Sequence, residues 1–432
     1  MKQKLKNGNL AYQKWRNTPL SFRSQKIIKL AQILRNHSEK YAKLMSVEMG
    51  KPIRQSRAEI EKCAKACEFY SKHAEQFLKP QIIKTNSLKS YVCFEPLGLI
   101  LGIMPWNFPF WQVFRFAIPT LLAGNGVLLK HAPNVRKCAA EIEKIFLKAG
   151  FPKYLFQNLP LSIRETQTVI SDSLVRGVSL TGSVQAGKSV AEIAGKHLKK
   201  VVLELGGSDP FIVLKDANID LAIQEAITGR FGNCGQSCIA AKRFILLKPI
   251  ADKFIRGLLQ NISKIKMGDP FDPNTDLGPM ARNDLRSKLH QQVLKSLKNG
   301  NRILYGGKIP PGKAFFYPPT LVQLKNLKVP LWQEEVFGPV AVVHVVNSES
   351  AALKLANETS FGLGASVHTR NLKKGEEFAQ YIEAGSCFVN QMVHSDPRLP
   401  FGGIKNSGLG RELSHYGMHE FVNIKTLSIY PA

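Results

Sequence analysis

The chain has 432 residues, a hydrophobic content of 44% and a formal net charge of +28. Its length allows two or three packed domains, and its composition is typical of a globular protein and excludes a largely disordered one. The charge raises a nucleic-acid or membrane-surface partner as an alternative. The 60 basic residues are spread along the chain, however, so we interpret them as solvated lysine-rich faces and predict no such partner.

No apolar segment has the length of a signal peptide or of a membrane span. The most apolar stretch, Leu99 to Met104, is interrupted by Gly102 and followed by Pro105. The seven cysteines form an odd set without C-x-x-C pairs or zinc-finger spacing, so no metal site is predicted. This cysteine usage predicts a reducing, cytoplasmic location.

Residues 20–78 carry helical periodicity and predict two or three helices. After Ser87 come two short β-like pieces, SYVCFEP and LGLILGIMP, and then strand and helix patterns that alternate. The alternating elements are strands at 126–130 and 175–180 and helices at 139–149 and 189–198. Alternation of this kind predicts a parallel sheet with crossover helices.

The pattern changes character around Glu204. Strand-like pieces at 211–214 and 244–247 open a second round of strands and helices that continues to about residue 400. Residues 423–430, NIKTLSIY, predict a terminal strand with no obvious partner nearby in the sequence.

Residues 182–189 read GSVQAGKS and satisfy the phosphate-loop pattern of nucleoside triphosphatases. Such an enzyme also needs an acidic residue at the end of an apolar strand to organise magnesium. The nearest candidate is Asp216, and Lys215 separates it from its apolar run. The alternative is a glycine turn that lets a helix N-terminus approach the pyrophosphate of a dinucleotide.

Cys238 stands in the polar turn NCGQSC, just before an apolar strand. A structural cysteine is usually surrounded by apolar residues, so these neighbours favour a reactive thiol whose pKa is lowered by its turn. Cys234 lies four residues earlier. It either forms a reversible disulfide with Cys238 or fills the turn as a small residue.

Glu204 ends the apolar run in LELGG. A carboxylate beside apolar surface is expected to have a raised pKa, which suits a general base, whereas the alternative is a surface glutamate at a strand end. The glycine pair that follows, Gly206 and Gly207, permits close approach of a ligand to the backbone and favours the base.

Asn107 lies between two prolines in MPWNFP, where its amide can donate to an oxyanion. If the next segment is helical, Asn107, Trp111 and Arg115 fall along one side of it. Arg115 then points inward among apolar residues, which requires an anion as its partner.

Five motifs in one order, PWNFP, LELGG, GQSC, EEVFGP and PFGGIKNSGLGRE, resemble the aldehyde dehydrogenase superfamily. The resemblance covers the chain from about residue 10 to its end and looks closest to the bacterial succinate-semialdehyde dehydrogenases. It implies an α/β fold with two Rossmann-like α/β domains and a small β oligomerisation flap. It also implies that the glycine turn at residues 182–187 binds NAD(P), which excludes the alternative function of a phosphate-loop hydrolase.

The resemblance implies a division into parts. The expected parts are an NAD(P)-binding domain at 1–77 and 97–205, a catalytic domain at 206–401, oligomerisation strands at 78–96 and 421–432, and a return segment at 402–420. A homodimer or homotetramer is expected from it. Similar proteins carry some tens of additional N-terminal residues, so cofactor affinity or stability is expected to suffer here, and a non-catalytic homologue stays an alternative.

The resemblance also implies roles for single residues. The catalytic residues would be Cys238 as nucleophile, Glu204 as base and Asn107 in the oxyanion hole. The cofactor residues would be Pro105, Trp106, Lys130, Gly182, Ser183, Gly187, Leu205, Gly206, Glu335 and Phe337. The reaction is then oxidation of an aldehyde to an acid through a thioester on Cys238, with NAD or NADP as cofactor. Pro133 neither favours nor repels the extra phosphate of NADP.

The substrate would be held by Arg115, Ser395 and Trp111. Arg115 stands where semialdehyde enzymes of the family place an arginine that pairs with the distal carboxylate of succinate semialdehyde. Gly232 stands where some of these enzymes carry a second arginine, so recognition of the carboxylate would be either weaker or shared with His394. A related semialdehyde or an aliphatic aldehyde stays an alternative substrate.

Overall fold

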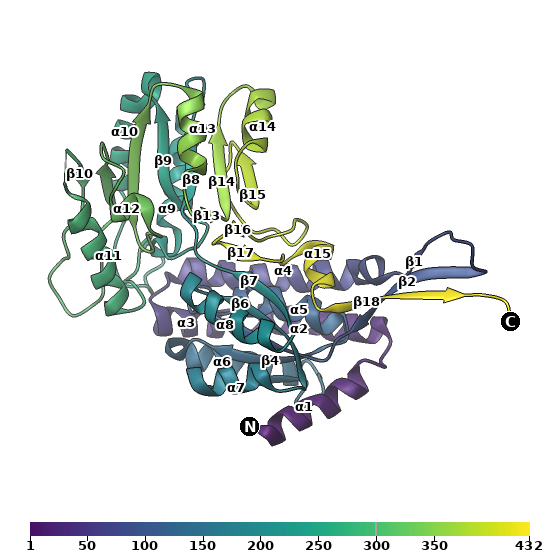
Figure 1. Cartoon of the computed structure of the whole chain (residues 1–432). Coiled ribbons are helices and arrows are strands. Elements are labelled where there is room, and N and C mark those ends of the chain that lie inside the picture. Colours follow the sequence, from purple (N-terminus) through teal and green to yellow (C-terminus); the bar gives the residue numbers. More distant parts are fainter. Residues whose placement is uncertain (299) are drawn as a thin grey trace.

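The computed structural model describes residues 1–298 and 300–432. Two lobes, each built on a mainly parallel sheet, meet along one face, and a narrow flap of strands projects from the first lobe (Figure 1). The predicted α/β architecture with two parallel sheets and a separate flap is confirmed. The predicted domain boundaries stay a prediction.

The first lobe contains a six-stranded sheet in the order β17-β7-β6-β3-β4-β5. Only β17 is antiparallel to its neighbour. Its strands are β3 (Leu99–Met104), β4 (Gly126–His131), β5 (Phe156–Asn158), β6 (Val175–Thr181), β7 (Lys200–Glu204) and β17 (Gly408–Leu409). Sequence alternation predicted β4 and β6 to within one residue of their ends.

The helices of the first lobe cover this sheet (Figure 1). They are α1 (Lys2–Trp15), α2 (Leu20–Asn36), α3 (Ser38–Met49), α4 (Ile53–Leu78), α5 (Trp111–Leu122), η1 (Pro133–Val135), α6 (Arg136–Lys148), α7 (Ile163–Ser171), α8 (Val184–Lys196) and α15 (Ser414–His419). Helix α8 begins five residues before its predicted start, because the Ser183 side chain accepts a hydrogen bond from the Ala186 backbone N–H and caps it there.

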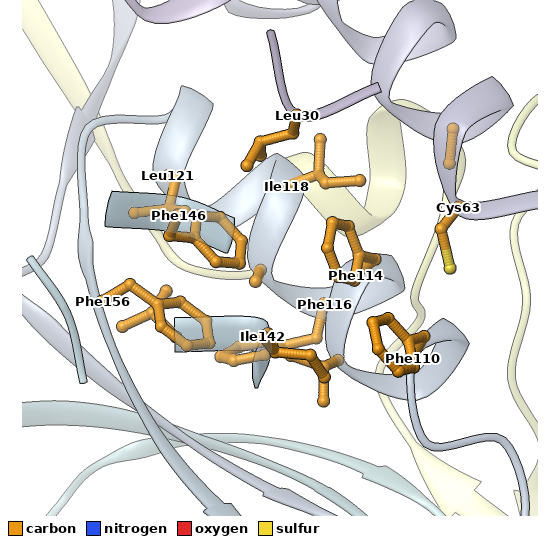
Figure 2. Close-up of a cluster of buried hydrophobic side chains, with 14 of the residues drawn as sticks. Leu30, Cys63, Phe110, Phe114, Phe116, Ile118, Leu121, Ile142, Phe146 and Phe156 are labelled. Carbon is orange, nitrogen blue, oxygen red and sulfur yellow. The ribbon is translucent and has the colours of Figure 1, made fainter. Parts of the chain in front are cut away.

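The core of the first lobe lies around α5, whose side chains are all buried. Figure 2 shows Phe114, Phe146 and Phe156 gathered in this cluster with Leu30 of α2 and Cys63 of α4. The rings of Phe146 and Phe156 stack with their centroids 4.1 Å apart. Close packing on both sides of α5 fixes the loop that precedes it, which carries Asn107.

The second lobe contains a seven-stranded sheet in the order β10-β11-β12-β9-β8-β14-β15. Its strands are β8 (Asp209–Val213), β9 (Ala241–Leu247), β10 (Arg302–Tyr305), β11 (Thr320–Gln323), β12 (Val340–Val346), β14 (Gly364–His368) and β15 (Ser386–Val389). Its helices are α9 (Ile219–Phe231), η2 (Gly232–Gly235), α10 (Lys248–Ile262), α11 (Asn283–Ser296), α12 (Pro330–Gln333), α13 (Glu349–Asn357) and α14 (Leu372–Gln380). A two-stranded pair, β13 (Phe361–Gly362) and β16 (Ile404–Lys405), lies where the chain returns to the first lobe.

The flap is a three-stranded antiparallel sheet of β1 (Gln81–Ile82), β2 (Lys89–Pro96) and β18 (Val422–Ile429). The predicted terminal strand is therefore present, and its partner is β2, more than 300 residues earlier in the chain. Periodicity alone does not identify a partner so distant. No helix within residues 1–298 and 300–432 is both long enough and apolar enough to cross a bilayer.

Candidate active site

A cleft of about 560 Å³ lies between the two lobes and is lined by residues of both. We call it the interlobe cleft. It brings together these residues that the sequence singled out: Pro105, Trp106, Asn107, Gly182, Ser183, Leu205, Gly206, Cys238, Glu335 and Phe337. These residues come from five separate stretches of sequence, so the fold alone makes them neighbours.

Cys238 follows a backbone turn with unusual geometry. Asn233, Cys234 and Gly235 all have positive φ angles, of 54°, 57° and 64°. A Cβ on Gly235 would lie 2.4 Å from the backbone oxygen of Gly338, so only glycine allows the two backbones to pass. The turn brings the nucleophile loop directly against the segment that carries Glu335 and Phe337.

The Cys238 thiol is half-buried, and burial raises its pKa to about 12, while Lys242 and Arg115 act in the opposite direction. The expectation of a lowered thiol pKa was wrong, because the effect of burial outweighs that of the nearby cations. Lys242 is fully buried, and its ammonium donates to the carbonyls of Ser237, Cys238 and Ala240. This cation therefore both shapes the nucleophile loop and favours the thiolate.

Asn107 is 4% exposed, and its Nδ2 donates to the carbonyl of Gln236, two residues before the nucleophile, at 3.1 Å. The Asn233 amide donates to the backbone oxygen of Asn107 at 2.8 Å. The other end of the loop is fixed by Glu59, whose carboxylate accepts from the backbone N–H groups of Phe110 and Trp111. Asn107 is thus held beside Cys238, with a second N–H on its amide available to a ligand.

Glu204 is 1% exposed and does not line the interlobe cleft. Both of its carboxyl oxygens are buried without a hydrogen-bond partner among the described residues. Burial raises its pKa well above the usual value, and Glu412 adds to this. Burial therefore favours the neutral form of Glu204, and acting as a base requires its carboxyl to reach a more polar environment nearer Cys238.

The glycine turn leads into the N-terminus of α8, where Gly182 and Ser183 line the interlobe cleft together with the first residues of the helix. Gly187 lets the helix approach the sheet, because a Cβ there would lie 2.6 Å from the Leu205 side chain.

Lys188, the phosphate-loop lysine, is exposed. Asp216 lies in the second lobe, where it accepts hydrogen bonds from Thr369, Arg370 and Asn371. The two halves of a phosphate-loop site are therefore not assembled.

The Glu335 carboxylate accepts from the Gly207 backbone N–H at 3.1 Å, and burial raises its pKa. Phe337 packs edge-on against Trp106, with ring centroids 5.7 Å apart. Arg230, which the sequence motifs do not include, is fully buried and donates to the backbone oxygens of Val336, Gly338 and Val340. Its signal was a charged residue at the end of a mostly apolar helix.

Lys130 does not line the interlobe cleft. It lies at a separate cavity of about 580 Å³ beside α6 and α7, which Pro133, Arg136 and Ser162 also line. Burial lowers the pKa of Lys130. We call this the edge cavity.

The three predicted substrate residues are not brought together in one cavity. Arg115 is 2% exposed and pairs with the carboxylate of Glu412, so the anion expected for it is internal. Trp111 is buried beneath the ammonium of Lys62. Ser395 lines a third cavity of about 720 Å³, which we call the α4 cavity and which Lys62, Phe108, Gly232 and His394 also line.

Comparison with known proteins gives one consistent result. The model of the aldehyde dehydrogenase family matches residues 1–427. Succinate semialdehyde dehydrogenase Sad of Escherichia coli, named as using NAD(P)+, is 45% identical over 96% of this chain and 90% of its own. A probable NADP+-dependent succinate-semialdehyde dehydrogenase of Synechocystis is 45% identical over 99% of this chain and 94% of its own.

Solved structures agree with the sequence comparison. The succinic semialdehyde dehydrogenase of Streptococcus pyogenes, solved with NADP+ as the cofactor, matches with a TM-score of 0.97 at 37% identity. The match covers 99% of this chain and 94% of that one.

Proposed function

This chain belongs to the aldehyde dehydrogenase family, and on that premise we propose that it oxidises succinate semialdehyde to succinate with NAD or NADP. The observation that carries the proposal is the interlobe cleft, which places Cys238 and Asn107 beside Glu335 and the N-terminus of α8. The names of the relatives supply the substrate and the cofactors.

The described residues fit a dinucleotide. The N-terminus of α8, with Gly182 and Ser183 in front of it, offers backbone N–H groups and a positive dipole end to a pyrophosphate. The Glu335 carboxylate can accept from ribose hydroxyls, and the Trp106 and Phe337 rings form an apolar wall. At the edge cavity, Lys130 would hold the adenosine ribose. When bound, the nicotinamide supplies the acceptor for the hydride.

The chain's own residues supply the other steps. The Cys238 thiolate adds to the aldehyde carbon, and the oxygen that becomes anionic accepts from the Asn107 amide and the Cys238 backbone N–H. Loss of hydride leaves a thioester on the sulfur. Glu204, once its carboxyl has moved from its buried position toward Cys238 and ionised, takes a proton from the water that attacks this thioester, and the acid is released. Lys242 favours the thiolate before it adds to the aldehyde.

We also propose a homodimer or homotetramer assembled through the flap, whose apolar side chains Ile82, Ile424 and Ile429 are exposed. The seven cysteines lie in the chain as free thiols, which supports the proposed cytoplasmic location.

The direct test measures the absorbance of reduced nicotinamide with succinate semialdehyde and either cofactor. Wild type should turn over, Cys238→Ala should lose at least about a thousandfold in kcat, and Cys93→Ala, a half-buried cysteine of the flap, should keep wild-type activity. A panel of butanal and semialdehydes of other lengths ranks the alternative substrates. Full turnover by Cys238→Ala, or none by wild type, contradicts the proposal.

A further inference from the structure

The α4 cavity meets the nucleophile loop from a different side than the interlobe cleft does. Ser237 and Ile239 line the α4 cavity, whereas Cys238 between them lines the cleft. Phe108, the neighbour of Asn107, also lines the α4 cavity. The α4 cavity therefore lies beside the nucleophile, where it could hold the rest of the chain of an aldehyde whose carbonyl reaches Cys238.

Two lysines in the wall of this cavity, Lys62 and the exposed Lys264, form no ion pair among the described residues, and Lys62 is the one that is half-buried. Lys62 lies on α4 and is half-buried, and its ammonium donates to the Ser395 hydroxyl at 2.6 Å. The same ammonium lies 4.4 Å from the centre of the Trp111 ring. No acidic side chain within residues 1–298 and 300–432 forms an ion pair with it. A cation held this way favours a negatively charged ligand.

Lys264 and His394 also line the cavity, but Lys264 is exposed and the His394 ring lies with its Nδ1 against the Met392 carbonyl, at 3.3 Å. The arginines near the cavity are already paired. Arg115 is neutralised by Glu412 and does not line the cavity. Arg54 does line it but pairs with Asp276 at 2.7 Å. Gly232 lines it without a side chain, and nothing lies within 4 Å of the position that its Cβ would take.

Resting on the proposed function, we infer that Lys62 is the residue that selects the distal carboxylate of the substrate, with Ser395 as its partner. The Ser395 oxygen accepts from Lys62, so its own O–H is free to donate to the same carboxylate. Trp111 acts through Lys62, because its ring faces the ammonium and holds it at the cavity wall. Arg115 does not line the α4 cavity, and its role is to hold the Glu412 carboxylate in an internal ion pair.

The test compares an anionic and an uncharged aldehyde of equal carbon number, succinate semialdehyde and butanal, with the wild type and with Lys62→Met. Methionine keeps the apolar stem and removes the charge. We expect KM for succinate semialdehyde to rise roughly 10- to 100-fold, with kcat and the butanal constants changed less than about twofold. Lys62→Arg should recover part of the loss. The control Lys65→Met changes an exposed lysine on the same helix and should behave as wild type.

A binding measurement separates ligand recognition from a structural role. Succinate, as the product, should inhibit butanal oxidation competitively in wild type, and its inhibition constant should rise in Lys62→Met by the same factor as KM. An equal loss for both aldehydes, or an unchanged ratio between them, overturns the assignment of Lys62. If wild type oxidises butanal but not succinate semialdehyde, the proposed substrate is wrong instead, and if it oxidises neither aldehyde the proposed activity fails.

Discussion

The single residues that organise this site are buried cations bonded to backbone carbonyls. Lys242 donates to three carbonyls of the nucleophile loop, and Arg230 donates to three of the segment around Glu335. Each replaces water for several carbonyls at once, so its removal leaves buried acceptors unsatisfied. The conformation of the nucleophile loop and of the Glu335 segment, and the positive charge beside each, therefore depend on the same side chains, Lys242 and Arg230.

Removing the Lys242 charge should make Cys238 less reactive. Because a nearby cation stabilises the thiolate, Lys242→Met should raise the thiol pKa by about one unit and slow alkylation about tenfold at any pH below that pKa. Iodoacetamide labelling across a pH series measures both quantities. Lys248→Met, at an exposed position, is the control, and Lys242→Arg keeps the charge if methionine impairs folding. Unchanged labelling rates would show that Lys242 only supports the loop.

Selectivity for the anionic substrate should fall as the pH rises. Burial, and then Arg115, lowers the pKa of Lys62 to about 8, while Cys63, Glu59 and Asp396 act in the opposite direction. The ammonium binds a carboxylate only below its pKa, so selectivity is present at pH 7 and lost above about 8. The ratio of kcat/KM for succinate semialdehyde to that for butanal should fall about tenfold per pH unit there. The ratio cancels the titration of Cys238, and a flat profile would contradict this assignment.

The sequence predicts those residues of the site that stand in recognisable motifs, and it does not predict the others. Asn107 and Cys238 were named because each stands in a distinctive local pattern, and both line the interlobe cleft. Lys62 and Lys242 have no such pattern, since their importance comes from what packs around them. Arg115 pairs with Glu412, almost 300 positions later in the chain. The presence of a buried arginine alone does not show whether its partner is a carboxylate of the protein or a carboxylate of the substrate.

At the scale of elements, the turn of η2 is the most constrained part of the site. Gly235→Ala would place a methyl group 2.4 Å from the Gly338 oxygen at a φ of +64°. We expect a loss of about 2–4 kcal/mol in the free energy of unfolding and a kcat reduced at least about tenfold, because the loop must shift. Thermal melts and steady-state kinetics measure these.

Gly195→Ala is the matched control, because nothing lies within 4 Å of its Cβ position near the end of α8. It should keep or slightly raise the melting temperature, since alanine favours helix over glycine. Equal behaviour of the two variants would show that the crossing of the η2 turn and the Gly338 segment is not tight.

The elements were predicted well where both local pattern and burial agreed. Strands β4 and β9 contain continuous apolar runs and were found, whereas α1 lies ahead of the predicted helices in a basic, weakly apolar segment. Helix α1 is stabilised by tertiary packing, with Trp15 fully buried and donating to the Leu121 carbonyl. Local propensity does not contain that information.

At the scale of the whole molecule, the flap should control assembly. Strand β18 is an edge strand with Ile424 and Ile429 exposed. Ile424→Lys should weaken the proposed oligomer through charge burial and should leave the monomer's melting transition nearly unchanged. Sedimentation velocity at several concentrations measures the association. Lys425→Ala, which alters a charge on the same strand, should keep the oligomer, and a wild-type monomer would contradict the proposal.

Because the chain returns to the first lobe near its end, the two large sheets are completed in a fixed order during translation. All strands of the second large sheet lie between residues 209 and 389, so that sheet is complete once residue 389 leaves the ribosome. The first sheet still lacks β17, and the Asn125 amide still lacks its partner, the carbonyl of Phe421. The lobe that is translated first is therefore finished last, and a nascent chain exposes the β7 edge until β17, Gly408–Leu409, has left the ribosome.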